Sequence, residues 1–494
     1  MADARHVLSV DLGTTGVTVL LFDRAARVTR KAYSEFTQHY PRPGWVEHDA
    51  EEIWSVTRRL ITEALGGEPP SSVAAIGITN QRETTVLWDR ETGRPYHRAI
   101  VWQCRRTAER CQQLKGAHSE LVAARTGLVI DAYFSATKIA WILEQVPEAK
   151  AGAAAGRARF GTIDTWIVDR LTGGGAHVTD PTNASRTLVY DIHKRAWDDE
   201  LCAVFGVPRS VLPEVKPSAG RFALTDAGVF GAEVPIAGIA GDQQAALFGQ
   251  GCVRPGQAKN TYGTGCFALL NAGQEPVRSR HGLVTTIACD AEGQPVYCLE
   301  GSVFVAGAVV QWLRDGLGII KSADETEARA RAVADNGGVY LVPAFVGLGA
   351  PYWDQDARGL LCGLTRGASA DHVIRAALES IAYQSRELID ALQADLQGKV
   401  TLDALKVDGG AVRNDFLMQF QADVLGLPVV RPKNIETTAQ GAAFLAGLGS
   451  GFWGSFAEIE RVLEVDRTFE PSMTPGERQQ LMAGWKRAVA RARG

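Results

Sequence analysis

The stretch that decides the fold is Val7-Leu-Ser-Val-Asp-Leu-Gly-Thr-Thr-Gly16, which leads into Val17-Thr-Val-Leu-Leu-Phe22. Near the middle of the chain, Gln257-Ala-Lys-Asn-Thr-Tyr-Gly-Thr-Gly265 leads in the same way into Cys266-Phe-Ala-Leu-Leu270. In both stretches an apolar strand reaches a Gly-Thr turn, and a second apolar strand leaves it. The two Gly-Thr pairs lie 250 residues apart in a chain of 494, so the sequence predicts that each half opens with the same strand-turn-strand unit.

A turn of this composition is suited to binding an anion. Glycine lets a ligand approach the backbone closely, a tight turn leaves N–H groups unpaired, and the threonine hydroxyls are further donors. Two such turns that face each other across a cleft would hold one polyphosphate from both sides. Two ordinary hairpin turns are the alternative interpretation. The shared form and the half-chain spacing favour phosphate binding.

The composition is that of an ordinary globular chain with a large core, with 46% hydrophobic and 22% charged residues. A formal net charge of −4 does not indicate the basic surface that binds nucleic acid or an anionic membrane. The eight cysteines include no Cys-x-x-Cys pair, which favours reduced, structural thiols. The uncharged stretch 336–353 holds four Gly and two Pro, so it is a poor candidate for a membrane-spanning helix. We expect a soluble, cytoplasmic protein.

Short apolar runs alternate with helical patterns along the chain, which is typical of α/β architecture. The strand-like runs are 74–78, 160–163, 235–239, 338–342 and 405–407. Between Asp371 and Leu392 apolar residues recur at helical spacing, and Asp371 is the expected cap. A break at 249–256 predicts two domains, 1–250 and 251–494, and a weakly held helix from Pro475 to Arg493 closes the chain.

Seven phrases spread over nearly the whole chain closely resemble the glycerol kinases, which belong to the carbohydrate kinase family within the actin-like ATPase superfamily. They are Ile78-Thr-Asn-Gln-Arg-Glu-Thr-Thr-Val86, Ile100-Val-Trp-Gln-Cys-Arg-Arg106, Asp131-Ala-Tyr-Phe-Ser-Ala-Thr-Lys138, Gly238-Ile-Ala-Gly-Asp-Gln-Gln-Ala-Ala-Leu-Phe-Gly249, Asn260-Thr-Tyr-Gly-Thr-Gly-Cys-Phe267, Val342-Pro-Ala-Phe-Val-Gly-Leu-Gly-Ala-Pro-Tyr-Trp-Asp354 and Val407-Asp-Gly-Gly-Ala-Val412. The resemblance implies two actin-like (ribonuclease H-like) α/β domains that flank a central cleft. The first would carry the glycerol site and the first phosphate hairpin, and the second would carry the second hairpin and the adenosine pocket.

The acceptor site can also be argued from chemistry. A small polyol offers only hydroxyls, so its pocket needs a carboxylate to accept, a guanidinium to donate and an apolar wall. Arg82 and Glu83 are adjacent in a predicted loop and fit the first two roles. By resemblance, the other substrate-binding residues are Trp102, Tyr133, Asp242, Gln243 and Phe267. Without the resemblance, the pair would be read as a surface ion pair, and Trp102 and Phe267 as core residues.

Asp242 is the predicted catalytic residue. It follows a strand and precedes a helix that starts near Gln243, which is the crevice position used for sites on α/β sheets. As a base it would accept the proton of a glycerol hydroxyl that attacks the γ-phosphorus of ATP; as a structural residue it would cap the helix. A helix N-terminus is expected to lower the pKa of this Asp. Because phosphoryl transfer passes through a loose transition state, a weak base is adequate.

The resemblance implies that ATP binds at both hairpins. The nucleotide-binding residues would be Thr14, Thr15, Gly16, Thr18, Thr264, Gly307, Gln311, Gly410 and Asn414. Asp11 and Asp242 would hold Mg2+, partly through water, because magnesium keeps much of its hydration. Gly307 can also be read as a packing glycine in an apolar helix. Thr18 departs from the family, which typically has an arginine there that helps to hold the phosphates.

The implied reaction is ATP-dependent phosphorylation of glycerol to sn-glycerol 3-phosphate by in-line transfer, by a homodimer or homotetramer. Two alternatives remain open. Another carbohydrate kinase, for xylulose, ribulose or gluconate, would share the nucleotide site and differ around Arg82, Glu83, Trp102 and Tyr133. An actin-like or chaperone-like ATPase would have no small acceptor, and its ATP turnover would not depend on glycerol.

Overall fold

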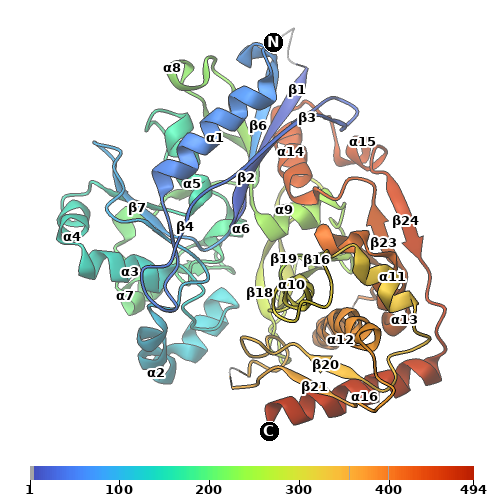
Figure 1. Cartoon of the computed structure of the whole chain (residues 1–494). Helices are drawn as coiled ribbons and strands as arrows, with labels where there is room; N and C mark the ends of the chain where they lie inside the picture. The colour runs from blue at the N-terminus through green and yellow to red at the C-terminus, as the bar shows by residue number, and fades with distance from the viewer. Residues whose placement is uncertain (1–4, 355, 399) are drawn as a thin grey trace.

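The computed structural model describes residues 5–354, 356–398 and 400–494. Two large mixed β-sheets form the centres of two bodies (Figure 1). The first sheet has the order β14-β15-β6-β1-β2-β3. Its strands are β14 (Ala219–Leu224), β15 (Pro235–Gly241), β6 (Val73–Asn80), β1 (His6–Leu12), β2 (Gly16–Phe22) and β3 (Val28–Glu35).

The second sheet has the order β18-β19-β17-β16-β22-β23-β24. Its strands are β18 (Val284–Cys289), β19 (Pro295–Val303), β17 (Cys266–Gly273), β16 (Ala258–Tyr262), β22 (Leu405–Asp408), β23 (Val429–Pro432) and β24 (Val465–Phe469).

The two sheets repeat one topology. In each, a hairpin (β1–β2 or β16–β17) lies in the middle, a third strand runs antiparallel beside it, and two strands run parallel to its first strand on the other side. An antiparallel strand, β14 or β24, closes that end of both sheets. The second sheet has β18 as an additional edge strand. The predicted duplication and the predicted actin-like α/β class are both confirmed.

Smaller strands and the helices surround the two sheets. The other strands are β4 (Gln38–His39), β5 (Glu47–His48), β7 (Val86–Asp89), β8 (Ala99–Ile100), β9 (Ala158–Gly161), β10 (Val178–Thr179), β11 (Tyr190–Asp191), β12 (Ala196–Trp197), β13 (Glu214–Val215), β20 (Tyr340–Val342) and β21 (Leu360–Cys362). The helices are α1 (Ala50–Leu65), α2 (Ala108–Thr126), α3 (Ala136–Gln145), α4 (Pro147–Ala154), α5 (Ile163–Leu171), α6 (Pro181–Ala184), α7 (Asp199–Phe205), α8 (Ala227–Phe230), α9 (Asp242–Gly249), α10 (Gly307–Asp315), α11 (Glu325–Arg331), α12 (Ala370–Leu396), α13 (Asp415–Leu425), α14 (Thr437–Ser450), α15 (Phe456–Glu460) and α16 (Pro475–Arg493).

Strand β1 is covered on both faces, which explains its almost continuous apolar sequence. Leu8 and Val10 face a core shared with α1 and α5, whereas Val7 faces a core built with α14. Ser9, the polar residue between them, points toward α14 and donates a hydrogen bond to the Ala439 carbonyl at 2.6 Å. The alternation follows from the two-residue period of a strand.

Helices α9 and α14 join the two bodies. Helix α9 follows β15 and α14 follows β23, the equivalent strand of the second sheet. Helix α14, from the second half of the chain, packs on β1, β6 and β15 of the first sheet. Small residues allow the close crossing: a Cβ on Gly441 would lie 1.8 Å from the Ala245 carbonyl oxygen, and one on Gly249 would lie 2.1 Å from that of Thr437. The division at residue 250 stays a prediction, and α14 is the segment that crosses it.

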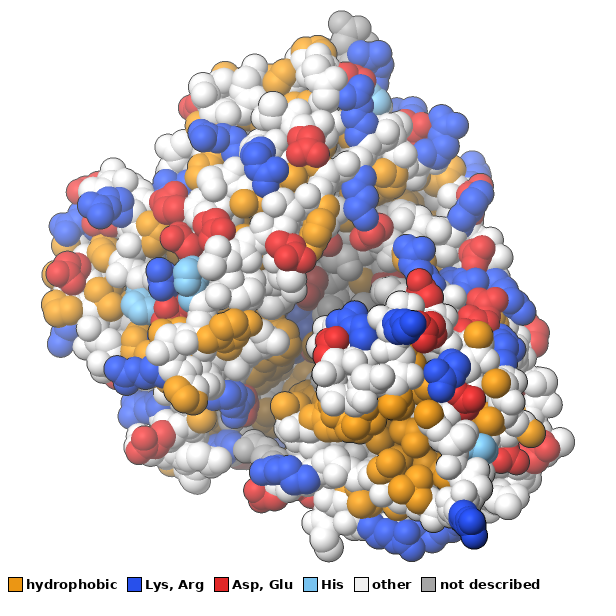
Figure 2. Space-filling view, viewed as in Figure 1, with side chains coloured by type: hydrophobic (Ala, Val, Ile, Leu, Met, Phe, Trp, Pro, Cys, Tyr) orange, Lys and Arg blue, Asp and Glu red, His pale blue; other side chains and the backbone are white. Residues whose placement is uncertain are grey.

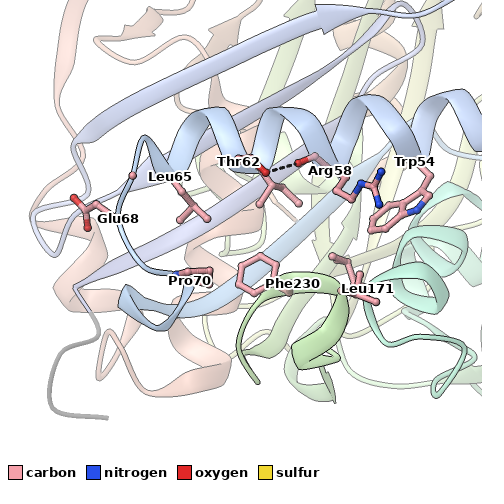
Figure 3. A pocket seen from close by; sticks show the side chains of 11 residues that line it. Trp54, Arg58, Thr62, Leu65, Glu68, Pro70, Leu171 and Phe230 are labelled. Carbon is pink, nitrogen blue, oxygen red and sulfur yellow. Dashed lines mark hydrogen bonds between the residues drawn. The ribbon is translucent and has the colours of Figure 1, made fainter.

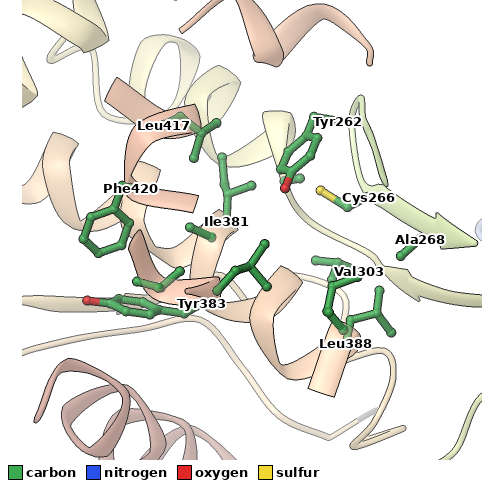
Figure 4. Packing of buried hydrophobic residues seen from close by; sticks show 14 of the residues in the cluster. Tyr262, Cys266, Ala268, Val303, Ile381, Tyr383, Leu388, Leu417 and Phe420 are labelled. Atoms are coloured by element: carbon green, nitrogen blue, oxygen red, sulfur yellow. The ribbon is translucent and has the colours of Figure 1, made fainter. Parts of the chain in front are cut away.

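The long helix α12 covers the second sheet and builds the core shown in Figure 4, where Ile381 and Leu388 approach Val303 of β19. The predicted cap at Asp371 was wrong. The N-cap is Ser369, which forms a capping box with His372, while Asp371 lies inside the first turn and pairs with Arg329.

The C-terminal helix α16 is held firmly, contrary to the sequence prediction. Trp485 is fully buried, donates to the Glu387 carboxylate at 2.9 Å and stacks on Tyr383. Among the described residues, all eight cysteines are unpaired and seven are buried. None of the helices formed by the described residues is long and apolar enough to cross a membrane.

Candidate functional site

Three neighbouring strands of the first sheet end at the same edge. Asp11 lies beside Thr79, and both Leu12 and Gly241 lie beside Asn80, in the parallel pairing of β1, β6 and β15. The carboxyl ends of parallel strands form the crevice in which α/β proteins bind ligands. The hairpin turn after β1, the loop after β6 and the start of α9 therefore converge there. Figure 2 shows the surface hollowed between the two bodies.

Arg82, in the loop after β6, lies at the centre of this edge and is only 2% exposed. Its Nε lies 3.2 Å from Asp242 Oδ1, and its Nη1 donates to Gln244 Oε1 at 3.2 Å. Its two terminal nitrogens grip the Glu300 carboxylate, with Nη1–Oε2 at 2.5 Å and Nη2–Oε1 at 2.9 Å. The alternative reading of Arg82 and Glu83 as a surface ion pair was wrong, because both side chains are buried.

Glu83 adopts a left-handed backbone with φ of 61°, which is uncommon for a residue with a side chain. Its carbonyl accepts hydrogen bonds from Ser135 Oγ at 3.1 Å and Lys138 Nζ at 3.5 Å. Its carboxylate accepts one from Arg186 Nε at 2.6 Å. Burial lowers the pKa of Lys138 to about 8. These contacts hold Glu83 in a conformation that the chain alone disfavours.

Glu300 and Arg186 were missed by the sequence reasoning. Glu300 lies in β19 of the second sheet, and Arg186 follows α6 of the first body. Arg186 Nη2 donates to Glu300 Oε1 at 3.1 Å, so the two arginines share one carboxylate. Burial opposes ionisation of Glu300, but Arg186 and Arg82 lower its pKa to about 2. The only signal in the sequence is that Glu300 is the single charged residue in the apolar run 296–303.

Asp242 is the first residue of α9, and its Oδ1 accepts a hydrogen bond from the Gln243 N–H at 2.7 Å. The N-cap position itself is Gly241. The side chain is 26% exposed, so a substrate can reach it. The expected lowering of its pKa was wrong: burial raises the pKa of Asp242, and the opposing effects of Arg82, Lys259 and the helix N–H are smaller.

Gln243 is tied to a cation of the second sheet. Lys259, in β16, is fully buried and donates to Gln243 Oε1 at 2.5 Å and to Thr261 Oγ1 at 2.7 Å. Burial lowers the pKa of Lys259, which favours loss of its proton, while Asp408 and Asp242 favour the charged form. Lys259 was also missed from the sequence. It places a positive charge behind Asp242 from the second half of the molecule.

Three aromatic rings, all half-buried, line the same region. The Trp102 ring lies edge-on to Tyr133 with centroids 5.5 Å apart, and edge-on to Phe267 with centroids 6.4 Å apart. The first two come from loops of the first body, and Phe267 comes from β17 of the second. The structure therefore brings together the three aromatic residues that the sequence singled out. The Arg186 guanidinium lies over the Tyr133 ring at 5.4 Å.

The turn between β1 and β2 is held by side chains. Thr14 Oγ1 accepts a hydrogen bond from Trp102 Nε1 at 2.9 Å, and its carbonyl accepts one from Gln38 Nε2 at 3.0 Å. Thr18 pairs across the hairpin with Asp11. Burial, and then the nearby Asp242 carboxylate, raise the pKa of Asp11 to about 8. The first hairpin and the aromatic rings are thus joined by the Thr14–Trp102 contact.

The turn between β16 and β17 is held by backbone. Gly307, the first residue of α10, donates to the Gly263 carbonyl at 2.9 Å, and Ala306 donates to the Thr264 carbonyl at 2.8 Å. A Cβ on Gly307 would lie 2.6 Å from the Gly263 carbonyl oxygen, so this position admits only glycine without a shift. The interpretation of Gly307 as a packing glycine is therefore confirmed, and its role in nucleotide binding stays a prediction.

The remaining predicted nucleotide residues lie around the second hairpin. Gln311 is exposed on α10, one turn after Gly307. Gly410 is exposed just beyond β22, and a Cβ on its neighbour Gly409 would meet the Tyr262 carbonyl at 2.5 Å. Asn414 caps α13 and donates to Thr326 Oγ1 at 3.1 Å, a structural duty that the sequence did not predict.

Two other hollows lie outside this site. One of about 200 Å3 lies between α1 and α8, where Trp54, Leu65 and Phe230 form a largely apolar wall (Figure 3). The other, of about 700 Å3, lies between the β2–β3 turn and the residues of β23 and β24. The charged cluster of Arg82, Asp242 and Glu300 is in neither wall.

The chain belongs to the FGGY family of carbohydrate kinases, whose N-terminal domain matches residues 6–249 and whose C-terminal domain matches residues 258–450. It is 58% identical to a glycerol kinase of Carboxydothermus hydrogenoformans, over 99% of this chain and 98% of that one. A crystal structure of Plasmodium falciparum glycerol kinase with ADP superposes with a TM-score of 0.92 at 37% identity, over 99% and 98% of the two chains. A xylulose kinase of Rhodospirillum rubrum shares the fold, with a TM-score of 0.84 at 24% identity over 99% of both chains.

Proposed function

We propose that this protein phosphorylates glycerol with ATP to give sn-glycerol 3-phosphate. The observation that carries the proposal is the convergence of Arg82, Glu83 and Asp242 beside the ring set Trp102, Tyr133 and Phe267. A guanidinium, a carboxylate, a general base and an apolar wall are the groups that a small polyol requires. The name shared by the relatives at 58% and 37% identity points to the same substrate.

The contacts of Arg82 leave a donor for the substrate. A guanidinium has five N–H groups. Among the described contacts, Nε faces Asp242, Nη1 serves Gln244 and Glu300, and Nη2 gives one N–H to Glu300. The second N–H of Nη2 is therefore the one we assign to a glycerol hydroxyl. Glu83 uses one oxygen for Arg186, and its other oxygen would accept a hydrogen bond from a substrate hydroxyl.

Asp242 is proposed as the base that takes the proton of the attacking hydroxyl. Its raised pKa makes it a better acceptor than an exposed Asp, and its partial exposure gives the hydroxyl access. Arg82, 3.2 Å away, keeps the carboxylate ionised and oriented. Positioning of the hydroxyl against the γ-phosphate would account for most of the rate, because phosphoryl transfer depends mainly on alignment and charge.

ATP is the proposed phosphoryl donor, with its terminal phosphates between the two hairpins and its adenosine near Gln311, Gly410 and Asn414. Mg2+ fits this site, because the Asp242 carboxylate helps to raise the pKa of Asp11, and a bound divalent cation would favour the ionised form of both groups. When bound, Mg2+ would neutralise charge on the phosphates. Two protein carboxylates suffice, since magnesium retains water and phosphate ligands. We also propose a cytoplasmic location, where ATP is available and the free thiols stay reduced.

A coupled assay of ADP release tests the function. Purified protein with ATP and Mg2+ is offered glycerol, dihydroxyacetone, xylulose, gluconate or no acceptor. We expect turnover with glycerol to exceed that with the sugars and with no acceptor. A preference for xylulose or gluconate would assign another carbohydrate kinase activity, and turnover independent of every acceptor would favour an ATPase.

A further inference from the structure

We propose that Glu300 is a positioning residue for polyol binding, which reaches from the second half of the molecule to hold Arg82 in its productive orientation. Glu300 lies in β19 of the second sheet, whereas Arg82 follows β6 of the first. The inference rests on the proposed function, because it takes Arg82 as the donor to the polyol. It adds a residue that does not itself touch the substrate.

The contact between the two side chains has the geometry of a strong, directional ion pair. Both guanidinium termini meet both carboxylate oxygens, at 2.5 Å and 2.9 Å, in a bidentate arrangement. The two side chains are 2% and 3% exposed, so water cannot replace either partner. A bidentate pair fixes the plane of the guanidinium, and this plane decides where the remaining N–H of Nη2 points.

Glu300 also reaches the second polyol residue through one intermediary. Arg186 Nη2 donates to Glu300 Oε1 at 3.1 Å, and Arg186 Nε donates to Glu83 Oε1 at 2.6 Å. The line Arg82–Glu300–Arg186–Glu83 therefore begins and ends on the two residues that would bind the polyol. Because Arg82 and Glu83 are neighbours in the chain, these contacts fix how the two side chains are oriented.

The position of Glu300 in its sheet ties this line to the aromatic wall. Glu300 pairs with Leu269 of β17, and Phe267 pairs with Ser302 of β19. Residues two apart on a strand share a face, so Glu300 and Phe267 project from the same face of the second sheet. A movement of the second body relative to the first would displace Phe267 and the Glu300 clamp on Arg82 together. Polyol affinity is thus made to depend on how the two bodies are placed.

The first test replaces Glu300 by Gln, which keeps the size and removes the charge. We expect the KM for glycerol to rise by at least about tenfold, because a buried guanidinium loses a charged partner. The KM for ATP should change by less than about threefold, because the hairpins are untouched. Glu379→Gln is the matched control: Glu379 is likewise buried, at 1% exposed, and is paired with Arg375 at 2.8 Å, but it lies on α12. Both KM values should be unchanged in that variant.

A double-variant comparison distinguishes positioning from general support of the fold. If Glu300 acts through Arg82, Glu300→Gln should have little further effect on the glycerol KM once Arg82 is already Ala. The Arg82→Ala/Glu300→Gln protein also removes both ions of the pair, so it remains informative where the single Glu300 variant folds poorly. Additive losses in the double variant would overturn the inference, as would equal increases of both KM values in Glu300→Gln.

The wild-type protein separates this inference from the proposed function. Absence of glycerol-dependent ATP turnover in the wild type would refute the function before any variant is made. Wild-type turnover together with an unchanged glycerol KM in Glu300→Gln would refute the role of Glu300 and leave the function intact.

Discussion

The two hairpins carry different side chains at the same register position. One step in from the turn, the first hairpin pairs Asp11 with Thr18, and the second pairs Thr261 with Phe267. An acid and a hydroxyl thus occupy the place at which the second hairpin has a hydroxyl and an aromatic ring. In the proposed function, the first hairpin would serve phosphate and a cation, and the second would contribute Phe267 to the apolar wall of the polyol pocket.

The two turns also differ in what holds them. Side chains of Trp102 and Gln38 hold the first turn, whereas the backbone of α10 holds the second. One topology therefore serves two tasks. The first turn depends on side-chain contacts, which a substitution can remove. The second turn depends on close backbone contacts, which an added Cβ would disturb.

The largest effect on activity is expected at Asp242, the first residue of α9, because the equivalent helix of the second half begins with a different residue type. Helix α9 begins with Asp242 and α14 begins with Thr437, although the strands before them, β15 and β23, occupy equivalent places in their sheets. We predict that Asp242→Asn folds normally and that its kcat falls by roughly 10²–10⁴, because general base catalysis is lost. Steady-state kinetics and thermal unfolding measure the two parts.

Asp226→Asn is the control for a purely structural aspartate. Asp226 caps α8 through its hydrogen bonds to the Gly228 and Val229 N–H groups and lies away from the site. Because Asn caps a helix about as well as Asp, this variant should keep its kcat. If Asp242→Asn also kept its kcat, Asp242 would have only a structural role at the start of its helix.

The next effect concerns Glu83, whose buried ion pair with Arg186 is linked to the second half through Glu300. We predict that Glu83→Gln raises the KM for glycerol far more than the KM for ATP. A buried, charged hydrogen-bond partner contributes about 1–3 kcal/mol, which corresponds to roughly 5- to 150-fold in affinity. Isothermal titration with glycerol and with ATP would measure the two affinities separately.

An exposed ion pair between the halves gives the comparison for Glu83. Glu120 of α2 meets Arg278 at 2.7 Å, but the two side chains are 76% and 64% exposed. Exposed pairs contribute little, so Glu120→Gln should leave both affinities within about twofold. Equal losses of glycerol and ATP affinity in Glu83→Gln would mean that Glu83 supports the fold and not the substrate.

Local motifs made much of this site predictable from the sequence. The hairpins, the Arg82–Glu83 loop and the strand-to-helix position of Asp242 are each contained in a few consecutive residues. The aromatic set was found by resemblance and is brought together by the structure. The α/β class followed from the alternation of strand and helix patterns.

Long-range contacts could not be predicted. Arg82 and Glu300 are 218 positions apart, and their contact depends on how one sheet packs against the other. Lys259 reads as an ordinary strand lysine until α9 is placed over it. The pKa of Asp242 was predicted in the wrong direction, because the helix end was visible in the sequence and the burial was not. The sequence alone therefore does not predict which charged side chains are buried between the two halves.

A smaller effect is expected from the backbone contact in the second half. We predict that Gly307→Ala raises the KM for ATP by roughly five- to tenfold, because the new Cβ pushes α10 from the hairpin tip at a cost of about one hydrogen bond. The KM for glycerol should change less. Gly476→Ala is the control, since a Cβ at that helical position meets nothing within 4 Å. An ATP KM as low as that of the wild type would show that the tip does not need α10.

The smallest effect is expected from placing an arginine at Thr18, where the family resemblance implies one. Thr18 is partly exposed and lies across from Asp11, so a guanidinium there would reach toward the phosphates but would also be attracted to that carboxylate. A partly exposed charge contributes about 0.5–1 kcal/mol, and we therefore predict that Thr18→Arg lowers the KM for ATP by about two- to fivefold.

Thr18→Gln is the control, because it adds length without charge and should leave the KM for ATP unchanged. Added salt should reduce the gain in ATP affinity of Thr18→Arg, because salt screens exposed charges. The equivalent position of the second hairpin is Phe267, which has no such role. A weaker ATP affinity in Thr18→Arg would mean that the arginine pairs with Asp11 instead of the nucleotide, and that the threonine is the better partner for this hairpin.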